Sequence, residues 1–372
     1  MRVVNLQAFR NKTSVLKSFT QRAKNSFLRR IQRHGIFVDL GQFWNQTPEQ
    51  KQHGKTKLLI VAPGNMPIPT NGWGAVEIIV SETLDLYTAA GFDVWVLNSR
   101  NIRKWREAKK IVFPVILSHS DIDNPRIRSN WPNAKIAGVS HYGLGAYPEK
   151  WDKGFQKILT GMKSCDVVVC LSKAIGNTFS MYIPSEKIII SPNGSAFESH
   201  CDLPRGINKI ICLGKVEKRK KQFELWKSLK TSGLEIVFAG PIVDERVIRE
   251  IEREPKLTNT FIGPIRRENL ITELGKYTSL ILISDGEADA LVLYEAQLAG
   301  LPVLVTERSM GAQNPELDWI CVISESPTSE EIHSALSAVI STPSKITKYA
   351  LENYNWAVRN KKLVSLLLDL SK

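Results

Sequence analysis

The sequence lacks long apolar runs. No stretch approaches the roughly 18 to 20 uncharged apolar residues that a membrane-spanning helix needs, and the first residues lack the compact apolar segment of a signal peptide. The 372-residue chain is therefore expected to stay in the cytoplasm.

Paired cysteines are also lacking. The five cysteines are odd in number and scattered, and no two of them form a CxxC pair. This pattern excludes a regular disulfide framework and a zinc site of the usual spacing. We therefore expect no metal cofactor, and small buried cysteines in a reducing compartment.

Acidic residues are missing from the first 38 positions, which hold nine Lys or Arg. This segment therefore carries most of the net charge of +13 of the whole chain. In this basic arm apolar residues recur at helical spacing, at Leu16, Phe19, Ala23, Phe27 and Ile31. A helix here would be amphipathic, with an apolar stripe on one side and a cationic face on the other. Such a helix suits the anionic inner face of a membrane, where the protein would be peripheral. Packing of the stripe on the protein itself is the alternative, and a transit peptide is a third.

Strand-like and helix-like segments alternate from Lys57 onward, in one series from "KLLIVAP" to "KIIISPN" and a second from "KIICLGKV" to "CVIS". Such β-α-β series predict mostly parallel, doubly wound sheets, and a chain of this length exceeds what one core usually organises. We predict two α/β domains that face each other across a cleft. The predicted divisions are a basic N-terminal extension (1–54), a first domain (55–200), a second domain (207–343) and a helical tail (344–372).

Two acids, Glu287 and Glu295, stand with seven residues between them around a short apolar run in the segment "SDGEADALVLYEAQLAGLPVLVTE" (284–307). The segment has the pattern of a buried strand end, a turn, a helix from Leu291 and a second strand. Packing explains its apolar residues only. Because the turn after the first strand opens at the carboxyl edge of the sheet, where open α/β folds hold ligands, Glu287 and Glu295 are predicted to face a ligand crevice.

Two glycines, Gly72 and Gly74, stand in the turn "PGNMPIPTNGWGAVE" before a helix predicted from Ala75. Glycine lets the backbone approach an anion closely, and the start of a helix offers unpaired amides and a positive dipole end. An ordinary loop rich in Gly and Pro is the alternative.

The second series opens on a basic segment, "CLGKVEKRKKQ". Lys215 follows a strand-ending glycine, and Lys220 lies five residues further on. The two cations can therefore bind a diphosphate and stabilise the negative charge that develops on it as it leaves. We predict that Lys218, Arg219 and Lys221 form a solvated face.

Two histidines, His119 and His141, end predicted strands in "VILSHSD" and "GVSHYG". A lone histidine near a strand end is usually a structural residue. Both nevertheless lie at the predicted carboxyl edge of the first sheet, where a ligand would bind.

The motifs "PTNGWGAVE", "GVSH", "SPNG", "LGKVEKRKKQ" and "GEADALVLYEAQLAGLPVL" together resemble the ordered signature of the family 4 retaining nucleotide-sugar glycosyltransferases. That family has the GT-B fold, with two Rossmann-like domains, and the resemblance runs from about Lys57 to the end of the chain. It implies a tail that returns to the first domain, with Tyr354 and Trp356 as packing anchors.

The resemblance also assigns roles to site residues. Glu295 would hydrogen-bond the ribose hydroxyls of the donor nucleotide, and Glu287 would meet the hydroxyls of the donor sugar. Lys215 and Lys220 would hold the diphosphate, and His141 would lie near the reacting carbon.

The sequence departs from the family pattern at two places. Lys215 stands where the family more often has Arg. Lys keeps the positive charge of Arg but lacks its bidentate geometry. Ala288, Asp289 and Ala290 replace a Gly-x-Gly before Leu291. Asp289 either caps the following helix or reads a donor hydroxyl, so Asp289, Ala290 and Leu291 join the predicted donor-binding residues.

These observations predict a glycosyltransferase, specifically a hexosyltransferase, that acts on a cell-envelope saccharide such as lipopolysaccharide or a lipid-linked glycan. No cofactor is expected beside the nucleotide-sugar substrate. The alternatives are the same fold glycosylating nucleic acid or protein, and a homologue that binds a nucleotide sugar without turnover. Nucleic acid is not expected as a partner of the leading candidate.

Overall fold

The computed structural model describes residues 41–49, 53–70, 73–151, 153–197, 208–230, 232–252, 261–339 and 342–372. The predicted basic arm (1–38) and Gly72 lie outside the described residues. The segment between the two predicted domains (201–206) lies outside them as well.

The first domain is built on a seven-stranded sheet with the strand order β1-β3-β2-β4-β5-β6-β7. Neighbouring strands are parallel, except that β1 pairs antiparallel with β3. The side chains from Leu58 to Val61 in the central strand β2 are fully buried, as expected for a parallel sheet that helices cover on both faces. The strands are β1 (Gln42–Asn45), β2 (Lys57–Ala62), β3 (Asp93–Asn98), β4 (Val115–Ser118), β5 (Lys135–Ser140), β6 (Val167–Cys170) and β7 (Ile188–Ile190).

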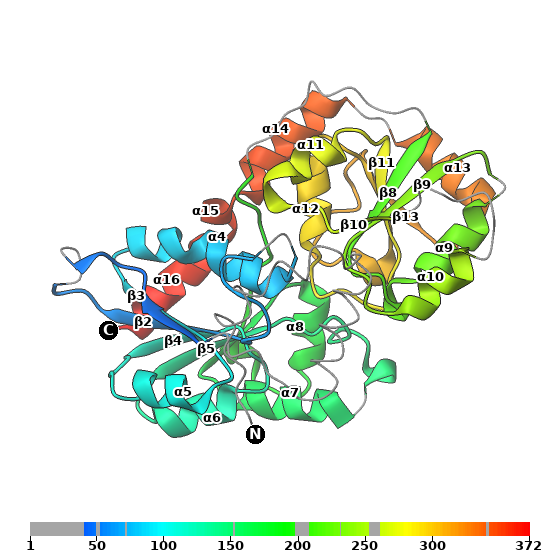
Figure 1. The fold of residues 1–372 in the computed structure, drawn as a ribbon. Coiled ribbons are helices and arrows are strands. Elements are labelled where there is room, and N and C mark those ends of the chain that lie inside the picture. Colours follow the sequence, from blue (N-terminus) through cyan, green and yellow to red (C-terminus); the bar gives the residue numbers. More distant parts are fainter. Residues whose placement is uncertain are drawn as a thin grey trace, which may run out of the picture.

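Helices cover both faces of this sheet, with α4 and α16 on one side and α5, α6 and α7 on the other (Figure 1). The chain continues from β2 to β3 on one side and later to β4 on the other. Such a reversal opens a crevice at the carboxyl ends of the strands. The helices are α4 (Ala75–Ala89), α5 (Ile102–Ala108), α6 (Asn124–Asn130), α7 (Lys153–Lys163), α8 (Lys173–Phe179) and α16 (Lys361–Leu370).

The second domain repeats the arrangement with six parallel strands in the order β10-β9-β8-β11-β12-β13. The strand order of this sheet reverses between β8 and β11. An apolar core lies on each face of the sheet. The strands are β8 (Lys209–Leu213), β9 (Glu235–Ala239), β10 (Phe261–Gly263), β11 (Ser279–Leu282), β12 (Val303–Thr306) and β13 (Ile320–Ile323). The helices are α9 (Gln222–Leu229), α10 (Glu245–Glu252), α11 (Leu270–Leu274), α12 (Leu291–Leu298) and α13 (Ser329–Ala338).

The tail passes from the second domain back to the first. Helix α14 carries Tyr354 in the core of the second domain, whereas Leu363 and Leu367 of α16 lie in the core of the first. Between them, Trp356 of α15 packs with Ile78 of α4. The segments are α14 (Pro343–Tyr354), α15 (Trp356–Arg359) and α16, with breaks at Asn355 and Asn360.

Short 3-10 helices occupy several connections in the described residues. They are η2 (Pro148–Lys150), η3 (Ser185–Lys187), η4 (Lys218–Lys220), η5 (Arg267–Asn269) and η6 (Glu307–Ser309).

The prediction of two doubly wound α/β domains is confirmed. The predicted boundary at residue 55 differs from the structure, because β1 already belongs to the first sheet. A four-residue edge strand with one face open to solvent carries too little periodicity to be recognised.

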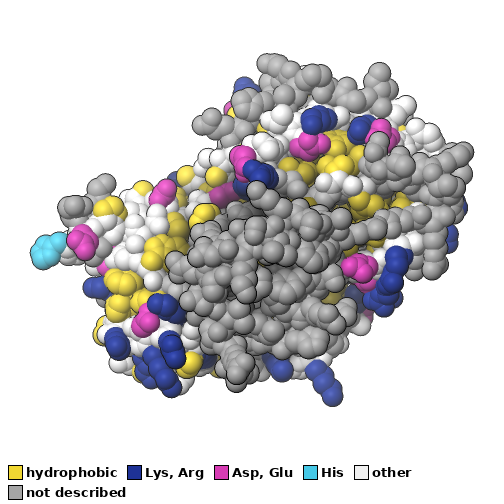
Figure 2. All heavy atoms as spheres, in the orientation of Figure 1, with side chains coloured by type: hydrophobic (Ala, Val, Ile, Leu, Met, Phe, Trp, Pro, Cys, Tyr) yellow, Lys and Arg dark blue, Asp and Glu magenta, His cyan; other side chains and the backbone are white. Residues whose placement is uncertain are grey.

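On the face drawn in Figure 2, the Lys and Arg side chains of the described residues lie over both domains, and acidic side chains lie among them. Acidic side chains therefore interrupt the cations where the described residues are visible on that face.

Candidate functional site

A cleft lies between the two domains, with a cavity volume of about 1010 Å³. The first domain lines it with the loops after β2 and β5 and the first turn of α4. The second domain lines it with the loops after β8, β9 and β11 and the first turn of α12. The crevices of both sheets thus open into one cavity, which is where ligands of such folds bind.

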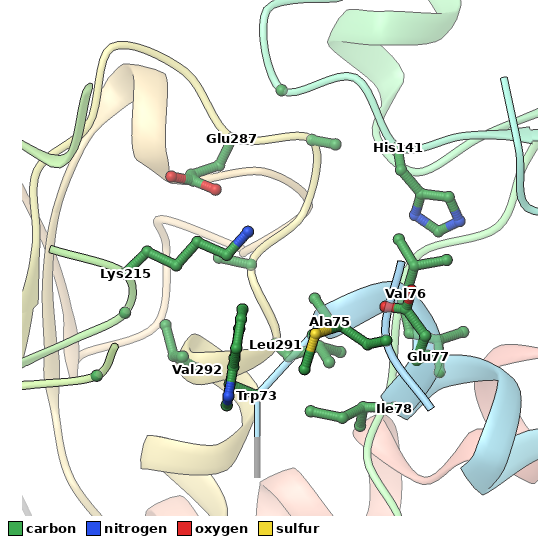
Figure 3. A pocket seen from close by; sticks show the side chains of 18 of the residues that line it. Trp73, Ala75, Val76, Glu77, Ile78, His141, Lys215, Glu287, Leu291 and Val292 are labelled. Carbon is green, nitrogen blue, oxygen red and sulfur yellow. The ribbon is translucent and has the colours of Figure 1, made fainter. Parts of the chain in front are cut away.

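The predicted site residues approach the cavity from both sides. Figure 3 shows Glu287 and Lys215 reaching into it from the second domain, with His141 across from them. The Lys215 ammonium lies 5.7 Å from the centre of the Trp73 ring, close enough for a cation–π attraction. The ring therefore stabilises this cation beside the cavity that both residues line.

Glu287 is held by two cations of the loop after β8. Its Oε1 lies 2.6 Å from Lys220 Nζ and 2.9 Å from Arg219 Nη1. Burial alone would raise the pKa of Glu287, but Lys220 and Arg219 together outweigh burial and lower it. Glu287 is therefore an ionised acceptor of hydrogen bonds at the cavity wall. Lys220, which is only 8% exposed, reaches the cavity beside it.

The basic segment differs from the predicted solvated face at two positions. Arg219 donates a hydrogen bond of 2.6 Å to the Gly286 carbonyl, and Lys221 Nζ lies 3.3 Å from a Glu325 carboxylate oxygen. The prediction is wrong for these two residues, because the turn η4 folds the segment onto the loops after β11 and β13. Lys218 is exposed, as predicted.

Glu295 lies in α12 and is 2% exposed. Arg267 donates to Glu295 Oε1 and also donates from Nε to Glu82 Oε1 of the first domain, at 3.1 Å. Glu82 Oε2 in turn accepts a hydrogen bond of 2.6 Å from Trp356 Nε1. Burial raises the pKa of Glu295 and outweighs the opposing effect of Arg267, while Glu82 adds to the rise. Sequence reasoning missed Arg267 and Glu82, because only the packing of the two domains brings them together.

Protein donors occupy the carboxylate of Asp289. It accepts hydrogen bonds from the Asn193 backbone N–H at 2.7 Å, the Tyr294 hydroxyl at 2.8 Å and the Ala312 backbone N–H at 3.1 Å. Burial raises its pKa to about 6 against these hydrogen bonds. The N-cap residue of α12 is Ala290, so the helix-capping alternative for Asp289 is wrong. Asp289 instead ties the loop after β7 to the second domain, and its contact with a donor hydroxyl stays a prediction.

His141 and His119 contact each other at the edge of the cavity. Nε2 of His141 lies 3.0 Å from Nδ1 of His119, the ring centres are 5.2 Å apart and the ring planes are inclined by 23°, so the two rings meet edge to edge. They meet because β4 and β5 are adjacent parallel strands, each followed by one of the histidines. Sequence reasoning placed both at the same sheet edge but did not pair them.

Two helices begin at the cavity. Helix α4 follows Gly74, whose φ of 104° is a conformation that side chains other than Gly rarely adopt. Helix α12 follows Ala290, and neither helix has a side-chain cap. Their first-turn amides suit an anion. Gly74, Ala290 and Leu291 line the cavity, as the predicted donor-binding residues should, while Gly72 is not among the described residues.

Glu77 and Asp121 also line the cavity and were missed by the sequence reasoning. Glu77 is 4% exposed, and burial raises its pKa. Burial also raises the pKa of Asp121 to about 7, although the His141 backbone N–H opposes this by donating to it. Each is the last residue of a motif already singled out, Glu77 of "PGNMPIPTNGWGAVE" and Asp121 of "VILSHSD".

The lips of the cleft also touch each other. A Cβ added at Gly143 would lie 2.7 Å from the Gly286 carbonyl oxygen, so glycine is needed for this close approach. Nearby, Lys150 Nζ lies 2.9 Å from Asp285 Oδ1. Together with the bond from Asn193 to Asp289, these contacts join the two domains.

In the part of the chain that the structure describes, no group of three or more His, Cys, Asp or Glu is arranged to hold a metal ion. Over the same residues, no helix has the length and apolar character needed to cross a bilayer.

Comparisons with known proteins found similarity in structure but not in sequence. A scan against protein-family models gave no match, and a search of the curated proteins gave none either. Sucrose-phosphate synthase from Thermosynechococcus elongatus has a TM-score of 0.68 at 15% identity, with 85% of this chain and 99% of that one covered.

Two further structures cover 84% of this chain and 99% of their own at 13% identity. HepE from Anabaena, in complex with UDP and glucose, has a TM-score of 0.63. The lipopolysaccharide outer core galactosyltransferase WaaB has a TM-score of 0.61. At these identities the likeness shows the fold, and this chain has the GT-B fold.

Proposed function

We propose that the protein is a retaining glycosyltransferase that moves a sugar, specifically a hexose, from a nucleoside-diphosphate donor to a saccharide acceptor. The observation that carries this proposal is the pair Glu287 and Glu295. Glu295 is buried and Glu287 is partly buried, each beside a cation at the wall of one cavity, and seven residues separate them at the crevice of the second sheet. The GT-B fold supports the proposal, since the similar HepE was solved with UDP and glucose.

In this proposal the two acids divide the donor between them. Glu295 accepts hydrogen bonds from the ribose hydroxyls, and Glu287 accepts them from hydroxyls of the transferred sugar. Lys215 and Lys220 face the diphosphate, together with the open first turn of α12. Because charge develops on the diphosphate as it leaves, fixed donors of this kind lower the barrier to transfer.

The proposed reaction needs no metal ion and no protein base. The bond between the anomeric carbon and the diphosphate oxygen breaks, and a bond from the acceptor oxygen forms on the same face of the sugar. The acceptor proton passes to the leaving diphosphate. In this proposal the ionised Glu287 and the Nδ1 side of His141 stabilise the sugar as it gains oxocarbenium character.

For the acceptor we propose a cell-envelope saccharide, either lipopolysaccharide or a lipid-linked glycan. The basic arm supports an acceptor at a membrane surface, and the likeness to WaaB, a lipopolysaccharide galactosyltransferase, points the same way.

The donor can be tested by thermal unfolding with UDP, GDP, ADP and CDP. A ligand at about 100 times its Kd stabilises the folded protein by about 2.7 kcal/mol. We expect one of the four to raise the Tm by several degrees, and its sugar to be hydrolysed slowly without acceptor. The matching nucleoside, which lacks the diphosphate, is the control. A Tm shift without turnover of any sugar nucleotide would favour the alternative of a homologue that binds a nucleotide sugar but does not transfer it. No Tm shift with any of the four nucleotides would contradict the proposal.

The arm can be tested by deleting residues 1–38 and measuring cosedimentation with anionic and neutral liposomes. Each cation contributes at most about 1 kcal/mol near an anionic surface, and salt screening reduces the sum over nine cations. We expect the deletion to weaken binding to anionic liposomes while the Tm shift with nucleotide stays. Equal liposome binding by both proteins contradicts the membrane role, and retention of the full chain on DNA would favour a nucleic-acid acceptor.

A further inference from the structure

We propose that His119 is a positioning residue that fixes the tautomer of His141, so that His141 offers an Nδ1–H donor to the sugar in the cleft. This inference rests on the proposed function for the identity of the ligand. The arrangement of protons on the two rings can be tested without it.

The geometry allows one proton between the two rings. Nδ1 of His119 and Nε2 of His141 are 3.0 Å apart, a hydrogen-bond distance for two ring nitrogens. A neutral imidazole carries its proton on one nitrogen and a lone pair on the other. In a neutral pair, therefore, one ring donates and the other accepts, and the tautomer of one ring determines that of the other.

Both rings are neutral near pH 7. Burial lowers the pKa of His141 to about 4. Burial, and then the neighbouring His141, lower the pKa of His119 well below its ordinary value. A second charge in the hydrogen-bonded pair would add repulsion to the loss of hydration.

The surroundings of His119 decide which ring donates. Its Nε2 is buried and has no hydrogen-bond partner among the described residues. A buried N–H without a partner is rarer and more costly than a buried lone pair without one. His119 is therefore protonated on Nδ1 and donates to Nε2 of His141, which leaves the proton of His141 on its own Nδ1.

The remaining nitrogen of His141 belongs to the cleft. Nε2 is turned to His119, and the ring lies at the cavity wall opposite Lys215 and Glu287 (Figure 3). An Nδ1–H at this place donates to a hydroxyl or ring oxygen of the sugar, whereas a bare Nδ1 could only accept. His119 thus determines whether His141 donates or accepts a hydrogen bond at the sugar, without touching the ligand itself.

The tautomers can be read by nitrogen NMR on protein labelled with ¹⁵N-histidine, with the six histidines assigned by single substitutions. We expect His141 and His119 both to carry their protons on Nδ1 at pH 7. The opposite tautomers, with both protons on Nε2, would mean that His119 finds an acceptor such as a water in the small cavity beside it. That result overturns the proposal.

Two substitutions separate positioning from packing. His119→Leu keeps an apolar body but removes the donor, so we expect mixed tautomers at His141 and a kcat about tenfold lower, as for one lost hydrogen bond. His119→Asn places an amide N–H near the position of Nδ1, and we expect a kcat within about threefold of the unmodified protein. KM and nucleotide affinity should stay unchanged in both.

The outcomes also separate this inference from the proposed function. Equal loss of kcat in the Leu and Asn variants, or an unchanged His141 tautomer in the Leu variant, refutes a positioning role for His119. If no sugar nucleotide is turned over by the unmodified protein, the proposed function fails while the tautomer measurement still decides the pairing.

Discussion

Replacing Glu287 by Gln should lower the kcat of sugar transfer by about 100-fold to 1000-fold, the range seen when one preorganised electrostatic contact is removed. Its proposed partners are hydroxyls on the transferred sugar, and these contacts strengthen as the bond to the diphosphate breaks. Affinity for the free nucleoside diphosphate should be unchanged or tighter, because Lys220 and Arg219 lose the charge that now pairs with them. Steady-state kinetics and calorimetry measure the two effects.

A matched control is Glu325→Gln. Glu325 pairs with Lys221 of the same basic segment, at 3.3 Å, but does not line the cavity. The Gln at 287 keeps a carbonyl that accepts from Lys220, so the variant should fold, and thermal unfolding checks this. A kcat that falls equally in both variants would assign the loss to the basic segment and not to Glu287.

Replacing Glu295 by Ala should raise the Kd for the nucleoside diphosphate by about tenfold to 100-fold, since a hydrogen bond to a charged group contributes roughly 1.5 to 3 kcal/mol. The same loss should appear with the whole sugar nucleotide, because the bonds belong to the ribose. Turnover at saturating donor should change far less than in the Glu287 variant. Arg267 keeps Glu82 as a partner, so the substitution leaves no cation without one. Calorimetry with nucleoside diphosphate provides the measurement.

Glu235→Ala provides the comparison for Glu295. It removes a carboxylate at the amino end of β9 in the same sheet, where Glu235 pairs with Lys209 at 2.8 Å, and the nucleotide affinity should not change. Equal loss of affinity in the Glu287 and Glu295 variants would mean that their roles are misassigned. No loss in either would make both acids structural.

Local sequence pattern was enough to predict the elements that build the cleft. Strands such as β2 and β12 are continuous apolar runs bounded by turn residues, and that pattern arises only when a strand is buried on both faces. Because parallel strands joined by helices expose their carboxyl ends on one edge, the same reading placed Glu287, Lys215 and His141 at the cleft. Both features follow from the order of residues that are close to one another in the chain.

The edge strand β1 could not be predicted in this way. Phe43 and Trp44 are half-buried, and their strand exists because β3 offers an unpaired edge to it. Arg219 and Lys221 were also misjudged, because a run of cations in sequence is indistinguishable from a solvated face until the turn η4 directs it against the loops after β11 and β13.

The sequence by itself determined the fold class, the two-domain division and the edge of each sheet where the charged residues lie, since periodicity and turn residues act over a few positions. The tertiary structure alone decided which side chains pair. Glu82 and Arg267 are 185 residues apart in the chain, and they meet only because the two domains pack together. His119 and His141 meet because sheet order places β4 beside β5. Hydrogen bonds and ion pairs depend on distances through space, and these follow from strand order and domain packing, which no local pattern encodes.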